Sequence, residues 1–93
     1  MLTVEWLDSA IQDVIEIIDY ISQFDPIAAL DMKDLFISTA ERIPDQPYAG
    51  RLGLVAGTRE KIPHPRYRMI YRVTHNTIEI VNVVHTSRLY PFE

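Results

Sequence analysis

The sequence predicts a two-layer α+β fold in which an antiparallel hairpin of two helices packs on one face of a sheet. Two amphipathic stretches with helical period, residues 9–23 and 26–43, are separated by little more than Phe24 and Asp25. So short a link predicts antiparallel neighbours. Two later runs, residues 64–73 and 77–85, have the alternation or the β-branched content of strands, and residues 58–62 form a shorter strand before them. The helical stripes need an apolar sheet face to cover them, so the order β-α-α-β-β-β predicts two layers.

The first strand and the start of the first helix lie within the first dozen residues. Residues 1–7 alternate apolar and polar side chains, which favours a strand. Asp8 or Ser9 then offers an N-cap, and Ser9 and Gln12 have the spacing of a capping box. We therefore expect the helix to begin at about residue 9.

The second helix has clearer boundaries. Asp25 is a good N-cap and Pro26 is tolerated at the first helical position, while Pro44 ends the helical pattern. Residues 44–57 contain prolines and glycines and form a long loop for so small a domain. A loop of this length indicates a contribution to a binding edge.

The strand at residues 64–73 has two opposed faces, because strand side chains alternate with period 2. One face is an apolar floor, made of Tyr67, Met69, Tyr71 and Val73. The other is a row of guanidinium groups, from Arg66, Arg68 and Arg72. Arginine forks match phosphate and carboxylate geometry. The row therefore faces either an external anion or acidic partner, or acids of its own fold.

Composition excludes several classes of function. The 93 residues suffice for one domain, residues 1–93, and contain no cysteine, which excludes disulfides, thiol catalysis and zinc–thiolate sites. No His, Asp and Glu cluster has metal-ligand spacing, and no phosphate-binding glycine loop is present. We expect neither cofactor nor metal. No apolar run approaches the ~20 residues of a membrane helix, so a cytoplasmic location is expected.

Charge is divided unevenly along the chain, whose net charge is −4. Residues 1–50 carry two basic and ten acidic side chains, whereas residues 51–93 carry seven basic and three acidic ones. A basic half often contacts a partner, but the two halves can also neutralise each other within the fold.

Several short motifs occur in a fixed order along nearly the whole chain. They are Trp6-Leu-Asp-Ser-Ala10, Asp19-Tyr-Ile21, Asp25-Pro-Ile-Ala-Ala29, Gly57-Thr-Arg-Glu60, the strand at residues 64–73, Ile78-Glu-Ile-Val81 and Val84-His-Thr-Ser-Arg88. Taken together in this order, the motifs resemble the RelE/ParE superfamily of bacterial type II toxins, and the ParE branch most. The resemblance implies a curved, mainly antiparallel sheet and a small antitoxin that wraps and neutralises the toxin. Any contact with DNA would be made through that antitoxin.

The superfamily implies two alternative targets. ParE-like members block DNA gyrase and are not nucleases, and in that case the contacts with the target would come from Arg59, Lys61, Arg66, Arg68 and Arg88. RelE-like members cleave messenger RNA on the ribosome. A nuclease would use His85 or Tyr90 as acid or base, with Arg68 and Arg88 on the phosphate. The acidic pI of about 5.2 and the single lysine in residues 59–62 favour the ParE-like alternative.

Several of these side chains also have a plain structural explanation. Arg72 is expected to pair with Glu60 or Glu79. His64 is expected to cap a turn and His75 to be a polar hairpin residue, while His85 favours a structural role. We expect core positions for Trp6, Tyr20 and Phe36.

Overall fold

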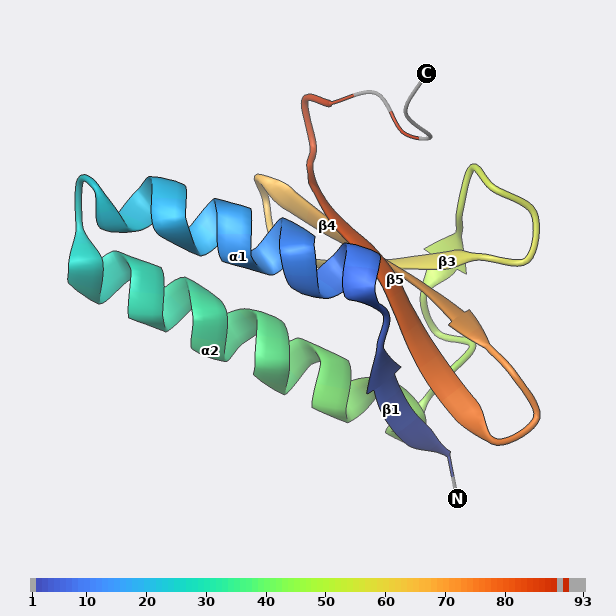
Figure 1. Cartoon of the computed structure of the whole chain (residues 1–93). Helices are drawn as coiled ribbons and strands as arrows, with labels where there is room; N and C mark the ends of the chain where they lie inside the picture. The colour runs from blue at the N-terminus through green and yellow to red at the C-terminus, as the bar shows by residue number, and fades with distance from the viewer. Residues whose placement is uncertain (1, 89, 91–93) are drawn as a thin grey trace.

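The computed structural model, which describes residues 2–88 and 90, has two helices packed on one face of an open five-stranded sheet (Figure 1). The helices are α1 (Asp8–Ser22) and α2 (Pro26–Arg42). The strands are β1 (Thr3–Trp6), β2 (Arg51–Leu52), β3 (Arg59–His64), β4 (Tyr67–Val73) and β5 (Thr77–His85). Their order in the sheet is β1-β5-β4-β3-β2. The predicted α+β fold is confirmed.

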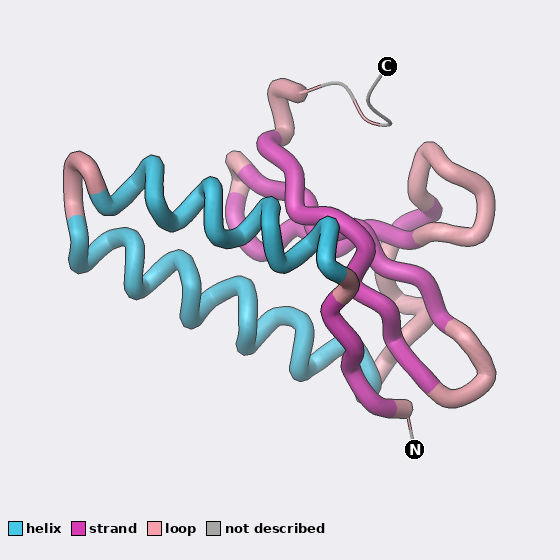
Figure 2. The backbone as a smooth tube through the Cα atoms, in the orientation of Figure 1, coloured by secondary structure: helices cyan, strands magenta, loops and turns pink. Residues whose placement is uncertain are grey.

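Strand pairing is mixed, because β1 runs parallel to β5 while the other neighbours are antiparallel. Figure 2 shows the helices side by side along one face of the sheet. The segment predicted as a long loop also contains two short elements, the 3-10 turn η1 (Ile43–Asp45) and the two-residue strand β2.

The two helices begin in different ways. Asp25 caps α2 as predicted, since its carboxylate accepts the Ala28 N–H at 3.0 Å and Pro26 is the first helical residue. The predicted capping box of α1 is wrong. The helix begins at Asp8 without a side-chain cap, and the Ser9 hydroxyl donates instead to the Val81 carbonyl of β5.

The core lies between the helices and β4 and β5. Phe36 is fully buried, as predicted, and Trp6 is half-buried against the core. The expectation for Tyr20 is wrong, because its side chain is 63% exposed near the end of α1, where its ring contacts Phe24. The other buried members of this core are Ala10, Ala40, Ile43, Tyr67, Met69, Tyr71, Ile78, Ile80 and Val83.

Helix α1 also covers an exposed edge of β5. Strand β1 ends opposite Ile80, and β5 carries an irregularity just beyond it, where Tyr71 pairs with Ile80 but Ile70 pairs with Asn82. The Asp13 carboxylate accepts hydrogen bonds from the Val83 N–H and the Asn82 amide, each at 2.9 Å. The helix thus satisfies strand groups that have no strand neighbour. Within the described residues, no helix is long and apolar enough to cross a membrane.

Candidate functional site

The sheet face turned away from the helices holds a buried ionic cluster. The Glu60 side chain is 2% exposed and lies 3.2 Å from the Arg68 guanidinium and 3.0 Å from that of Arg51. Arg68 itself is 9% exposed. Of the two alternatives left open for the row of guanidinium groups, the second therefore holds at Arg68, whose partner is an acid of its own fold.

Arg59 is also held by internal acceptors. Its guanidinium donates to the carbonyls of Tyr48 and Gly50, at 3.1 and 3.0 Å, and lies over the Tyr48 ring. From β4, the Tyr71 hydroxyl donates to the Pro47 carbonyl at 2.7 Å and accepts the Gly50 N–H. Only glycine fits at position 50, because a Cβ there would meet the Tyr71 hydroxyl. These contacts fix the long loop onto the sheet.

Two residues near the C-terminus lie beside Arg68. The Arg88 carbonyl accepts from the Arg68 guanidinium at 3.4 Å, and the Tyr90 hydroxyl donates to the Asn82 amide oxygen at 3.1 Å. Burial raises the pKa of Tyr90 above its ordinary value of 10.0, and two nearby carboxylates add to the rise. Tyr90 therefore stays protonated at neutral pH and can act only as a proton donor there.

His85 lies on the opposite side of the sheet from Arg68. It pairs across strands with the core residue Tyr67, whose ring it meets edge-on with centroids 5.4 Å apart. Its Nδ1 accepts the Ser87 N–H at 3.1 Å, so the neutral ring carries its proton on Nε2. The four residues predicted for a nuclease are thus brought together only in part. The sheet separates His85 from Arg68, whereas Arg88 reaches both: its carbonyl accepts from Arg68, and it lines a pocket together with His85.

The remaining predicted residues lie on β3, on β4 and in the turn between these strands. Arg72 pairs with Glu79 at 2.6 Å, and the His64 ring accepts the Arg66 N–H within the turn between β3 and β4, both as expected. Arg66 belongs to this turn, where it is exposed, and not to the strand. Among the residues that the structure describes, the side chains of Lys61 and Arg66 have no ion-pair partner.

Sequence reasoning missed Glu60 as the centre of this cluster. A single acid among the arginines of residues 51–72 was the available signal. Its position beside Arg68 depends on the register in which Glu60 pairs with Ile70, and that register comes from the turn between β3 and β4.

A comparison with known families decides the class of protein. Residues 4–90 match the model of the ParE toxin of the type II toxin–antitoxin system parDE. The chain belongs to the ParE toxin family. It lies within the wider RelE/ParE superfamily, as the sequence motifs indicated.

Relatives from both branches resemble this ParE-family chain. It is 36% identical over 89 residues to toxin RelE2 of Caulobacter vibrioides, an alignment that covers 96% of this chain and all of the relative. Two solved structures share the fold. One, of a chromosomal ParDE system from P. aeruginosa, has a TM-score of 0.82 and 21% identity, and the match covers 91% of this chain and 96% of that one. The other is the RelBE2 toxin–antitoxin complex of Mycobacterium tuberculosis, with a TM-score of 0.56, 22% identity and coverage of 90% and 96%.

The ParE-family chain carries a second candidate surface on its helices. A groove of about 370 Å³ is lined by Trp6 together with Ile11, Val14, Ile15, Lys33 and Ile37. Ile11 and Ile15 are 43% and 48% exposed, although both belong to the apolar stripe of α1. The sheet therefore buries only part of that stripe. No three His, Cys, Asp or Glu side chains within residues 2–88 and 90 are placed to hold a metal ion.

Proposed function

We propose that this chain is a growth-inhibiting toxin that acts by binding DNA gyrase and does not cleave RNA. The observation that carries the proposal is the neutralisation of Arg68 by the buried Glu60 carboxylate. Metal-free RNA cleavage needs a base for the 2′-hydroxyl, an acid for the leaving oxygen and cations for the phosphorane. In this chain the Arg68 guanidinium is already paired with Glu60, and His85 lies on the other side of the sheet from Arg68.

The target-binding residues of this proposal fall into two groups. Lys61 and Arg66 lack internal ion-pair partners among the described residues and would contact the gyrase surface directly. Arg59 and Arg68 are bound to acceptors of this chain and would hold the contact surface in shape. Arg88 completes the set, beside Arg68.

A supercoiling assay tests the proposal. Purified full-length chain is added to gyrase, ATP and relaxed plasmid, and the expected result is inhibition. A double variant, Lys61→Ala with Arg66→Ala, should need roughly tenfold more protein, whereas Arg72→Ala is the matched control on an internally paired cation. Gyrase that remains active at toxin concentrations that arrest growth would overturn the assignment.

A ribosome-dependent mRNA endoribonuclease is the second candidate. Two observations favour it: Arg68 lies near the Arg88 carbonyl and the protonated Tyr90, and Arg88 lines a pocket together with His85. Toeprinting on translating ribosomes separates the two candidates. The gyrase proposal predicts no cleavage, whereas cleavage that is lost in Arg68→Ala would establish the nuclease.

We further infer a cognate antitoxin, which acts in the cytoplasm and covers the groove between α1 and α2. The apolar lining of the groove and its exposed isoleucines suit the apolar face of an amphipathic helix. The antitoxin would also make any contact with DNA. Co-purification of the untagged product of the neighbouring gene is the expected result. Normal growth on expression of the toxin alone would instead indicate a partner-binding relative without toxicity.

A further inference from the structure

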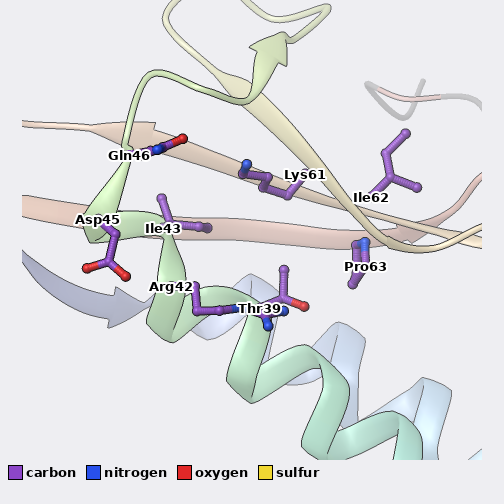
Figure 3. A pocket seen from close by; sticks show the side chains of 8 residues that line it. All are labelled: Thr39, Arg42, Ile43, Asp45, Gln46, Lys61, Ile62 and Pro63. Atoms are coloured by element: carbon purple, nitrogen blue, oxygen red, sulfur yellow. The ribbon is translucent and has the colours of Figure 1, made fainter.

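A second cavity, of about 360 Å³, lies between the end of α2, the turn η1 and β3 (Figure 3). Thr39 and Arg42 reach it from α2, Lys61 from β3 and Gln46 from the loop after η1. Residues from three separate segments thus meet in one polar pocket, away from the ionic cluster around Glu60.

The pocket contains two cations without internal partners. Within the part of the chain that the structure describes, neither Arg42 nor Lys61 forms an ion pair, whereas Arg51, Arg68 and Arg72 are all paired. In Figure 3 the Lys61 side chain extends toward Gln46, and Arg42 runs beside Thr39. Asp45 also lines the pocket, but its carboxylate turns away from Lys61.

The pocket also holds a buried hydroxyl. Thr39 is 8% exposed, and its Oγ1 is among the buried side-chain atoms that have no hydrogen-bond partner in the described part of the chain. An unsatisfied buried hydroxyl is unfavourable in the free protein. A ligand oxygen that reached this group would relieve the penalty and would gain hydrogen bonds from the two cations.

The net charge of the pocket and its apolar wall indicate which kind of anion it would bind. Arg42, Lys61 and Asp45 together carry one positive charge, which matches a monoanion. The acids of the neighbouring helix α2, which are Asp31, Asp34 and Glu41, would repel a polyanion such as nucleic acid. The apolar wall, formed by Ile43, Ile62 and Pro63, suits the methylene stem of a glutamate.

We propose that this pocket binds one glutamate side chain of the antitoxin. The identity of this occupant rests on the antitoxin inferred above, whereas the carboxylate chemistry rests on the pocket alone. The aliphatic stem packs on Ile43 and Ile62, and the carboxylate accepts from Arg42 and Lys61. A single buried charge-assisted contact of this kind would fix the register of the partner chain.

A titration with small probes tests the carboxylate site without gyrase, DNA or antitoxin, so its result is independent of the gyrase proposal. Full-length chain is titrated with N-acetyl-glutamate methylamide, with the glutamine analogue and with inorganic phosphate, and backbone amide NMR shifts are followed. The glutamate probe should shift residues 39, 42, 61 and 62, and the glutamine analogue should not. Equal binding of both probes, tighter binding of phosphate or shifts elsewhere would overturn the proposal.

Variants sharpen the test. Arg42→Gln and Lys61→Gln should each weaken the glutamate probe roughly tenfold, and Arg66→Gln, an exposed cation outside the pocket, should leave it unchanged. Thr39→Val should raise the melting temperature of the free protein and weaken the probe. Unchanged stability together with unchanged binding would show that the hydroxyl has no role.

The antitoxin complex tests the occupant. Arg42→Gln should raise the Kd for the antitoxin roughly tenfold relative to Arg66→Gln. Suppose that Arg42→Gln leaves the Kd for the antitoxin unchanged although the unsubstituted chain binds the glutamate probe. The antitoxin would then not be the occupant, and the glutamate would come from another protein.

Discussion

At Glu60, one carboxylate is shared by two guanidinium groups in different surroundings. The side chain of Arg51 is 59% exposed, whereas that of Arg68 is 11% exposed. Exposed pairs contribute little, because water screens them. A buried cation that loses its only acid remains uncompensated in a poorly polarisable environment. The burial of Arg68 therefore makes Glu60 a structural requirement.

Glu60→Gln should lower the free energy of unfolding by about 3 kcal/mol, because it leaves the Arg68 guanidinium buried without a counter-charge. Urea denaturation measures this change. Arg51→Gln is the control. It should lower the free energy of unfolding by less than about 1 kcal/mol, because Glu60 remains paired with Arg68. Equal losses in the two variants would show that burial of Arg68 is not what makes Glu60 important.

At the scale of elements, α1 is bound to β5 by polar contacts as well as by packing. Ser9 and Asp13 bond the Val81 carbonyl and the Val83 N–H, beyond the point where β1 ends. The helix thus takes the place of a missing strand along that edge. The same arrangement leaves part of the apolar stripe of α1 facing solvent, in the groove with α2.

Asp13→Ala should destabilise the protein by about 1–3 kcal/mol, because it leaves the Val83 N–H and the Asn82 amide without their acceptor. Chemical denaturation gives the loss, and hydrogen exchange should show faster exchange of the Val83 amide. Gln12→Ala, at the neighbouring exposed position, should change stability by less than ~0.5 kcal/mol. Unaltered exchange at Val83 would contradict the assigned contact.

The helical groove gives a prediction about binding. Ile15→Lys should weaken antitoxin binding at least about tenfold, because it places a charge in the apolar contact, and it should leave folding intact because Ile15 is 48% exposed. Calorimetric titration measures the affinity. Ile27→Lys is the matched control, since Ile27 is 73% exposed and does not line the groove. Equal weakening in both variants would argue against the groove as the contact.

At the scale of the whole molecule, residues 1–50 stay acidic, because the basic residues 51–93 form their ion pairs largely among themselves. The ion pairs Arg51–Glu60, Arg68–Glu60 and Arg72–Glu79 all lie within the basic half. They do not use the acids of the helices. The toxin therefore presents an acidic helical layer and a sheet layer whose cations are partly neutralised from within.

Alkaline pH should destabilise the whole molecule. Burial raises the pKa of Tyr67, Tyr71 and Tyr90 above the ordinary value of 10.0. Their contribution to stability is fully present below pH 10, where both states are protonated, and is lost as the pH rises through the higher folded-state values. Urea denaturation at pH 9 and pH 11 should show the fall, which should be smaller in Tyr71→Phe. An equal fall in that variant would mean that Tyr71 does not contribute.

Periodicity was sufficient to predict the helical hairpin and the strands β4 and β5, and the cap at Asp25 followed from local chemistry. Local reasoning failed where a distant residue competes for the same group, as Val81 does for the Ser9 hydroxyl. The alternation of side chains along the strand correctly placed Arg68 and Tyr67 on opposite faces of the sheet. It could not show what covers Arg68, because the position of Glu60 depends on strand register and that of Tyr90 on the path of the C-terminal segment.

Strand β5 lies between β1 and β4, so the first strand of the chain has only the last strand as its neighbour. A nascent chain that is still missing residues 77–85 has an unpaired first strand, an open β4 edge and an α1 without its anchor. Completion of the sheet therefore waits until residues 77–85 have been synthesised. Shortened chains that lack residues 77–85 would therefore be unfolded substrates for proteases and would not be active toxins.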